Sequence, residues 1–135
     1  MPSFEFFTLS KPFAYRRMYP MSEIKQLTAK IKAFRDARDW KQFHNHKDVA
    51  LSLVLEASEV LEHFQWKSPQ EVEEHGKNNK DELADELADV AIYLFELADN
   101  LKIDLPQAML NKMKKNALKY PVHKAKGRHT KYNKL

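Results

Sequence analysis

The chain is poor in residues that cross-link a fold or interrupt helices. Its 135 residues contain no cysteine and two glycines, which excludes disulfides and thiolate metal sites and leaves few positions that favour irregular backbone. The six prolines fall mainly outside the segments with periodic apolar residues, where they can end helices without breaking them. No apolar run approaches the roughly 18 residues of a membrane span. These absences predict a helical protein without a membrane segment. The lack of cysteine is compatible with the cytoplasm, where we expect this protein.

Charge is distributed unevenly along the chain. The net charge is +4, of which residues 1–20 carry +2 and residues 122–135 carry +5 without any acid, so residues 21–121 carry −3. A basic tail on an acidic core is compatible with a polyanionic ligand that is held through a metal ion. It is equally compatible with a tail that is only solvated. No basic stripe runs through the core, so we expect neither a nucleic-acid nor a membrane partner.

The length of the chain corresponds to about one domain. Residues 1–20 contain aromatics without a clear period, so we expect a poorly ordered extension. Residues 21–121 form the predicted domain, which begins at Met21 with Ser22 as a helix N-cap and Glu23 in the first turn. The basic tail of residues 122–135 is too polar to pack alone.

Apolar spacing predicts an all-α fold with four main helices, over residues 23–42, 48–66, 80–101 and 105–120. In the third, leucine and valine recur at intervals of three and four residues from Leu83 to Leu101. Asp104 is the predicted cap of the fourth, with Pro106 in its first turn. The polar stretch 70–79 between the second and third helices is expected to be a short solvated helix or a loop.

Two pairs of carboxylates provide the main chemical signal. Glu56 and Glu59 share one helix face, as do Glu86 and Asp89 on the third helix. Apolar neighbours of the first pair predict a buried helix, and buried carboxylates require partners or a metal ion. Antiparallel helices would bring all four together as oxygen ligands for Mg²⁺, which shares its coordination with phosphates. The spacing of either pair alone is ordinary on helix surfaces and would not indicate a metal site. A di-iron site is disfavoured because no Glu-x-x-His motif is present.

Aromatic side chains are concentrated in residues 40–44 and 64–66. They include Trp40, His44 and Trp66. These side chains could cover the end of a helical bundle, or they could form a platform on which a flat base stacks. The lysines of the fourth helix could be solvated or could hold phosphates.

Four motifs together resemble the MazG-like nucleoside triphosphate pyrophosphohydrolases, and among them the dCTP pyrophosphatase branch. The motifs are FRDARDWKQFH, the first acidic pair with FQW after it, the second acidic pair followed by Tyr93, and KMKKNALKYP. The resemblance covers residues 22–121. It implies an all-α four-helix fold and Mg²⁺-dependent hydrolysis of nucleoside triphosphates to monophosphate and pyrophosphate, a role in cleaning nucleotide pools. It also implies a homotetramer, a dimer of dimers whose sites are completed by neighbouring subunits.

The same resemblance implies roles for individual residues. The implied magnesium ligands are Glu56, Glu59, Glu86 and Asp89. Glu59 and Glu86 are also candidates for the general base, with Glu82 behind them. The residues expected around the base are Trp40, His44 and Trp66, and those expected at the sugar or phosphates are Tyr93, Lys112 and Asn116.

The preferred base stays open at this point, because Ile31 stands where a histidine can lie near the base in the dCTP branch. Two other functions are alternatives. One is a non-catalytic bundle that binds a nucleotide or a partner protein. The other is a bundle that binds nucleic acid through its basic tail.

Overall fold

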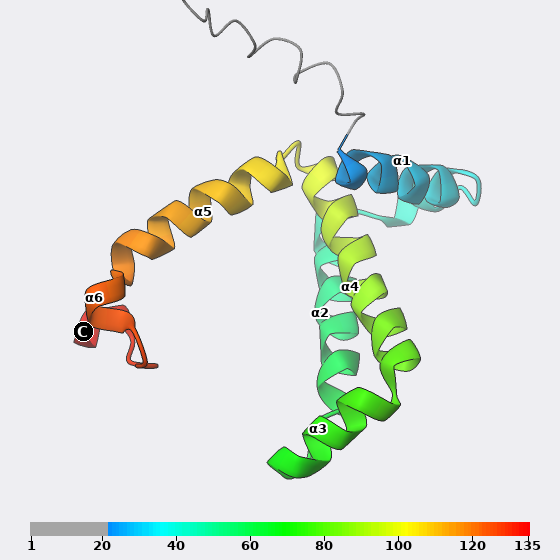
Figure 1. Ribbon diagram of the computed structural model, residues 1–135. Coiled ribbons are helices and arrows are strands. Elements are labelled where there is room, and N and C mark those ends of the chain that lie inside the picture. The colour runs from blue at the N-terminus through cyan, green and yellow to red at the C-terminus, as the bar shows by residue number, and fades with distance from the viewer. Residues whose placement is uncertain (1–21) are drawn as a thin grey trace, which may run out of the picture.

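The computed structural model describes residues 22–135, and the regular secondary structure of this part of the chain is helical, without strands (Figure 1). The expectations for residues 1–20 lie outside the described residues. The elements are α1 (Glu23–Asp36), η2 (Trp40–Phe43), α2 (His46–Glu62), α3 (Pro69–Asn78), α4 (Lys80–Asn100), α5 (Leu105–Lys119), α6 (Val122–Ala125) and η3 (Tyr132–Lys134). The predicted all-α class is confirmed. In the described part of the chain, no helix is both long enough and apolar enough to cross a membrane.

Side-chain caps define where four of the helices begin. Ser22, Asn45, Ser68 and Asp104 each accept a hydrogen bond from a backbone N–H in the first turn of α1, α2, α3 and α5, respectively. Each such cap satisfies a backbone donor that the helix cannot satisfy itself and contributes about 1 kcal/mol. Ser68 also forms a reciprocal capping box with Glu71. The predicted starts at residues 23 and 105 are therefore confirmed.

Two predicted helices end earlier than the apolar spacing indicated. The helix expected over residues 23–42 stops at Asp36, and Asp39 adopts a left-handed backbone (φ 54°) before the short 3₁₀ helix η2. The helix expected over 48–66 begins at His46 and ends at Glu62, and Trp66 also has positive φ (64°). Positive φ is uncommon for residues other than glycine and is incompatible with a continuing α-helix. The polar stretch 70–79 is largely helical, as α3.

Helices α2 and α4 form an antiparallel pair that is the centre of the fold (Figure 1). α1 crosses one end of this pair and contacts α4, and α3 lies at the opposite end, where it also contacts α4. We call the elements from α1 to α4 the body. α5 leads away from the body and carries α6 and η3 at its far end; we call residues 105–135 the arm.

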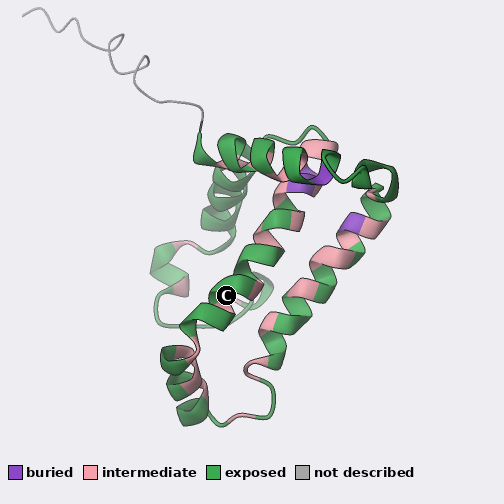
Figure 2. Ribbon diagram, turned by 90° about the vertical axis from the view of Figure 1, so that its right-hand side faces the viewer, coloured by how far each residue is buried: buried purple, intermediate pink, exposed green. Residues whose placement is uncertain are grey.

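Few side chains are buried in the single chain (Figure 2). Among the described residues, only Arg35, Val49, Glu96 and Ala98 are buried. The prediction that residues 48–66 form a buried helix is wrong for one chain, since Val54 and Leu61 of α2 are 61% and 62% exposed. The physical reason is that α4 covers one side of α2, α1 packs mainly on α4, and the arm turns away from both. The apolar α5 side chains Ala108, Met109, Met113 and Ala117 are likewise exposed.

The basic tail packs on the end of α5. The rings of Tyr120 and Tyr132 meet edge to face with centroids 6.0 Å apart, and Lys119 Nζ lies 4.8 Å from the Tyr132 ring centroid. Aromatic pairing and a cation over a ring each contribute on the order of 1 kcal/mol. The tail therefore extends the arm.

Candidate active site

Three of the predicted metal ligands converge where α2 and α4 face each other. Glu56 of α2 and Glu86 and Asp89 of α4 each offer a carboxylate oxygen, and these oxygens all lie within 4.8 Å of one another. Oxygens bound to one octahedral Mg²⁺ lie roughly 3–4 Å apart, because each is about 2.1 Å from the ion. The antiparallel pairing expected from the sequence therefore produces a cluster that fits a divalent cation after small side-chain adjustments.

Glu59 extends this acidic cluster. It lies on α2 one turn after Glu56, is exposed, and its carboxylate acts on that of Glu86 by raising the Glu86 pKa. All four predicted carboxylates are thus brought together, three in one set and Glu59 beside Glu86.

The carboxylates of the cluster repel one another. The pKa of Glu56 is raised above its ordinary value by partial burial and then by the charges of Glu59, Asp89 and Glu86. The pKa of Glu86 is raised by partial burial, by the charge of Glu59 and a hydrogen bond with it, and by Asp89, while His63 acts in the opposite direction. Like charges that share a site favour proton uptake, and a bound cation reverses this effect. The electrostatics therefore favour a cation in the cluster.

An imidazole pair lies at the end of α2 next to this cluster. His63 Nδ1 is 2.9 Å from His75 Nε2, and Asn79 Nδ2 is 3.0 Å from His75 Nδ1. If the Asn79 amide donates to Nδ1, then His75 Nε2 carries the hydrogen and donates to His63. The pair ties the end of α2 to α3.

A cavity of about 410 Å³ adjoins the acidic cluster between α1, η2 and α4. Its lining residues are Lys30, Ile31, Phe34, Arg35, Trp40, His44, Asp89, Ile92, Tyr93 and Glu96. Asp89 belongs both to the cavity and to the acidic cluster, so the two features are continuous. Volumes of this order are typical of small-molecule sites.

The aromatic wall of the cavity is built by η2 against α1. Trp40 meets Phe34 edge to face with ring centroids 5.9 Å apart, and its ring lies 6.4 Å from that of His44. The left-handed turn at Asp39 starts η2 and so turns Trp40 back toward α1. Of the residues predicted to bind a nucleotide, the fold brings Trp40, His44 and Tyr93 to this cavity.

The sequence reasoning missed two charged residues of the cavity, Arg35 and Glu96. They are the two buried charged side chains among the described residues, 3% and 2% exposed, and Arg35 Nη1 lies 3.1 Å from Glu96 Oε1. Burial alone lowers the pKa of Arg35, but hydrogen bonds to Asp36 and Glu96 raise it above its ordinary value, so the guanidinium stays charged. The spacing of Glu96 in the sequence could have identified it. Glu96 lies three residues after Tyr93 and seven after Asp89, which places the three residues on one helix face.

Three other predicted residues are not brought to the cavity within one chain. Trp66 is 94% exposed beyond the end of α2, and Lys112 and Asn116 are exposed on α5. Their predicted roles require a neighbouring subunit.

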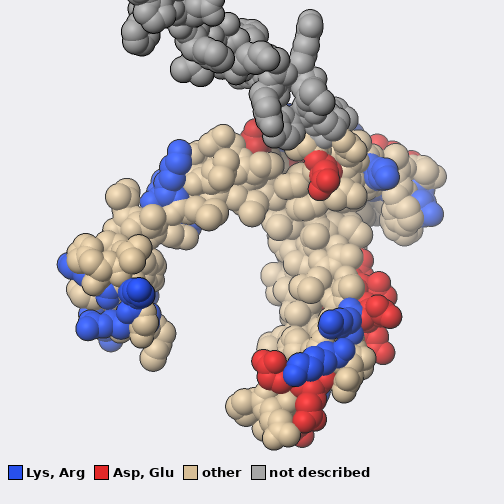
Figure 3. All heavy atoms as spheres, in the orientation of Figure 1, with Lys and Arg blue, Asp and Glu red and all other residues tan. Residues whose placement is uncertain are grey.

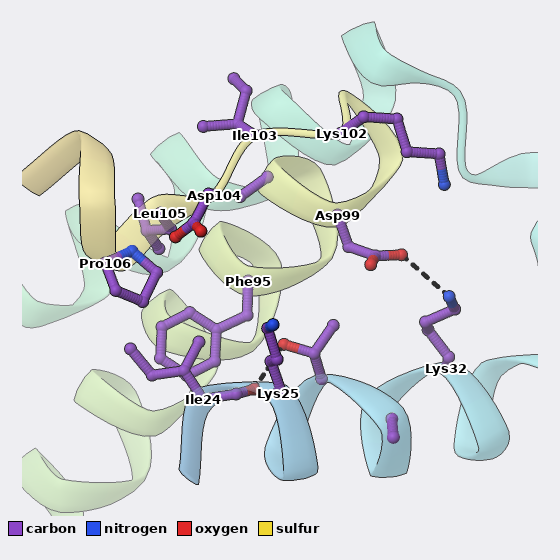
Figure 4. A pocket seen from close by; sticks show the side chains of 13 residues that line it. Ile24, Lys25, Lys32, Phe95, Asp99, Lys102, Ile103, Asp104, Leu105 and Pro106 are labelled. Atoms are coloured by element: carbon purple, nitrogen blue, oxygen red, sulfur yellow. Dashed lines mark hydrogen bonds and ion pairs between the residues drawn. The ribbon is translucent and has the colours of Figure 1, made fainter. Parts of the chain in front are cut away.

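A second cavity, of about 450 Å³, lies between α1 and the turn from α4 to α5 (Figure 4). Its main polar contact is an ion pair in which Lys32 Nζ lies 3.0 Å from Asp99 Oδ2. None of the predicted site residues lines it. We therefore assign the candidate active site to the acidic cluster and the first cavity.

Comparison with known proteins identifies relatives of this chain. A model of the MazG-like family matches residues 51–135. The chain is 38% identical over 130 residues to a dCTP pyrophosphatase 1 of Bos taurus, covering 95% of this chain and 75% of that protein. It is 40% identical over 128 residues to the protein of the same name from Mus musculus, covering 93% and 74% of the two chains.

A solved structure shows the same fold. The crystal structure of a pyrophosphatase from Archaeoglobus fulgidus has a TM-score of 0.72 and 38% sequence identity, and the match covers 76% of this chain and 96% of that one. The predicted resemblance is confirmed, and the chain belongs to the MazG-like family.

Proposed function

We propose that this protein is a Mg²⁺-dependent nucleoside triphosphate pyrophosphohydrolase. It would hydrolyse the bond between the α- and β-phosphates and release a monophosphate and pyrophosphate, in keeping with a role in cleaning nucleotide pools. The observation that carries the proposal is the continuity of an acidic cluster with an aromatic cavity through Asp89. The relatives named dCTP pyrophosphatase and the pyrophosphatase structure support the same reaction class.

The acidic cluster would hold the metal ion. Glu56, Glu86 and Asp89 are the ligands that converge, and when bound the ion neutralises phosphate charge and lowers the pKa of the attacking water. Glu59 lies beside this set and is exposed, so we assign it the removal of the water proton, with Glu86 as the alternative. The water oxygen bonds to the α-phosphorus while the bond to the bridging oxygen breaks, and pyrophosphate leaves with that oxygen.

The cavity would hold the nucleoside part of the substrate. Trp40 offers a ring face for stacking, which is worth about 1–3 kcal/mol per base. Tyr93 lies on α4 between Asp89 at the acidic end and Glu96 further along, so we place it beside the sugar. This arrangement orients the triphosphate toward the carboxylates, and positioning supplies much of the catalysis in reactions at phosphorus.

We also propose that the active protein is a homotetramer, with sites completed by neighbouring copies. Exposed apolar side chains on α2 and α5, among them Val54, Leu61 and Met113, would then be covered. The charges are complementary, because residues 105–135 carry nine Lys and Arg and no acid while residues 22–104 carry a net −7. Figure 3 shows basic side chains along the arm and at its far end, and acidic side chains with some basic ones among them on the lower part of the body. The expected cytoplasmic setting stays a prediction.

The test is an assay of a panel of ribo- and deoxynucleoside triphosphates, with Mg²⁺ or with EDTA, whose products are separated by ion-exchange chromatography. We expect monophosphate and pyrophosphate in the presence of Mg²⁺ and not in EDTA. Diphosphate with phosphate would contradict the proposed bond cleavage. Nucleotide binding that is equal with and without Mg²⁺, with no product, would instead support a non-catalytic binding protein.

A further inference from the structure

The cavity contains a buried carboxylate that the proposed reaction does not use. Glu96 is 2% exposed and lines the cavity, seven residues along α4 from Asp89. Seven residues of an α-helix span about 10 Å, so Glu96 lies well away from the acidic cluster. It therefore belongs to the end of the cavity where the base would lie.

Both contacts of the Glu96 side chain fall on one of its oxygens. Oε1 lies 3.1 Å from Arg35 Nη1 and 2.8 Å from His44 Nδ1. An ionised carboxylate only accepts hydrogen bonds, so both neighbours donate to Oε1. Arg35 is held in turn by Asp36, with Nε 2.8 Å from Oδ1. Glu96 is therefore fixed in orientation and its negative charge has a partner.

The second oxygen, Oε2, remains available as an acceptor. No donor to Oε2 is found among the residues that the structure describes, and none of their side-chain polar atoms is both fully buried and without a partner. Oε2 must therefore keep some access to solvent, and the cavity that Glu96 lines provides it. A ligand that fills the cavity would displace water from this oxygen. It would then need to supply a donor, because an unpaired carboxylate oxygen out of water is costly.

We infer that Glu96 selects nucleotides whose base presents an amino group to the cavity, with Oε2 accepting its hydrogen bond. This inference rests on the proposed function and names the feature of the base that the site reads. A carboxylate is the usual acceptor for the amino group of cytosine. Uracil and thymine present a carbonyl oxygen at the same ring position, which would lie against the negative oxygen. His44 and Arg35 are positioning residues for Glu96.

The sharpest test compares dCTP with dUTP, because these pyrimidines differ at the amino or carbonyl position. We expect the wild-type protein to prefer dCTP by roughly tenfold to a hundredfold in kcat/KM, the usual range for one well-placed polar recognition group. Glu96→Gln keeps the shape and still accepts from Arg35 and His44, but its amide can also donate to a carbonyl. The dCTP to dUTP ratio should therefore fall toward one or reverse, mainly through KM.

Asp99→Asn is the matched control. Asp99 lies three residues further along α4, pairs with Lys32 and lines the other large cavity. Its neutralisation should leave the ratio unchanged. If Glu96→Gln does not fold, Glu96→Asp keeps the charge and withdraws the oxygens by one methylene, and a reduced ratio is expected. An unchanged ratio in a folded Glu96 variant would overturn the inference and leave Glu96 as a structural partner of Arg35.

Failure of the proposed function is distinguishable from failure of this inference. If the wild-type protein hydrolyses no triphosphate, calorimetric titration with the hydrolysis-resistant α,β-methylene analogues of dCTP and dUTP still measures discrimination. Tighter binding of the cytosine analogue, lost in Glu96→Gln, would support the inference in that case. Equal affinities, or no binding of either analogue, would overturn it.

Discussion

The body and the arm differ in the contacts that their side chains make. The body holds its buried charges in pairs, with Arg35 and Glu96 joining α1 to α4. The arm exposes its apolar side chains, with Met113 65% and Leu118 84% exposed. Apolar surface of this kind is costly in water and marks contact with another protein surface. The body thus carries the acidic cluster and the cavity, whereas the arm carries groups that, under the proposed assembly, would complete the site of a second copy.

The largest effect is expected when a ligand is removed from the body's acidic cluster. Glu86→Gln should reduce kcat/KM by roughly a thousandfold or more, because the proposed metal binding and the proposed proton removal both involve this cluster. Without metal the variant should be at least as stable as wild type, since Glu86 is repelled by Glu59 and Asp89. Steady-state kinetics and thermal unfolding in EDTA measure the two effects.

The control for this variant is Asp85→Asn, which neutralises an exposed neighbour on α4 and should retain activity. Full activity in Glu86→Gln would show that the carboxylates serve another purpose. A loss of stability in EDTA would show that they are not mutually repulsive.

A charge placed on the apolar face of the arm should separate the copies. Met113→Glu would put a carboxylate into the proposed interface, so we expect a smaller assembly by light scattering with the helical circular dichroism retained. Activity should fall by roughly a hundredfold, because Lys112 and Asn116 would no longer reach a neighbouring site. Lys114→Gln, one residue further along α5, is the control. A fully active monomer would show that the body is sufficient alone.

Substitution of the two tryptophans should have smaller effects and tests which parts of the site one chain supplies alone. Trp40 lines the cavity of its own chain, whereas Trp66 is 94% exposed, and its predicted contact with a base would require a neighbouring copy. Trp66→Ala should raise KM about tenfold, in keeping with the loss of one stacking contact, and leave the Mg²⁺ affinity unchanged. The matched variant Trp40→Ala should raise KM and also lower the melting temperature, because Trp40 packs on Phe34. A collapse of metal affinity in Trp66→Ala would mean that Trp66 supports the fold.

The sequence predicted the helices and the acidic cluster better than it predicted the cavity and the exposed apolar face of the arm. Apolar spacing and caps such as Asp104 are local signals, and the two carboxylate pairs needed only antiparallel helices to meet. No glycine occupies the left-handed positions at Asp39 and Trp66, so the sequence carries no clear signal for these turns. Glu96 is one acid among many on an acidic helix, and its burial depends on the partner Arg35 61 residues earlier. The exposure of α5 depends on how the arm leaves the body, and in the proposed assembly also on other copies, and neither is a local property of the sequence.

The smallest expected effect is a pH dependence that belongs to the body. Glu56 and Glu86 have a pKa raised above the ordinary value of 4.5, so the folded state binds protons more tightly than the unfolded state. Their contribution to stability is therefore fully present below about pH 4.5 and is lost as the pH rises through the raised values.

In EDTA, unfolding followed by tryptophan fluorescence should show this loss, since both tryptophans lie in the body. Saturating Mg²⁺ should reverse it and stabilise the body more at pH 7 than at pH 4.5, because the ion competes with protons for the same oxygens. In Glu56→Gln/Glu86→Gln both trends should flatten, and an unchanged pH profile in that variant would place their origin elsewhere in the molecule.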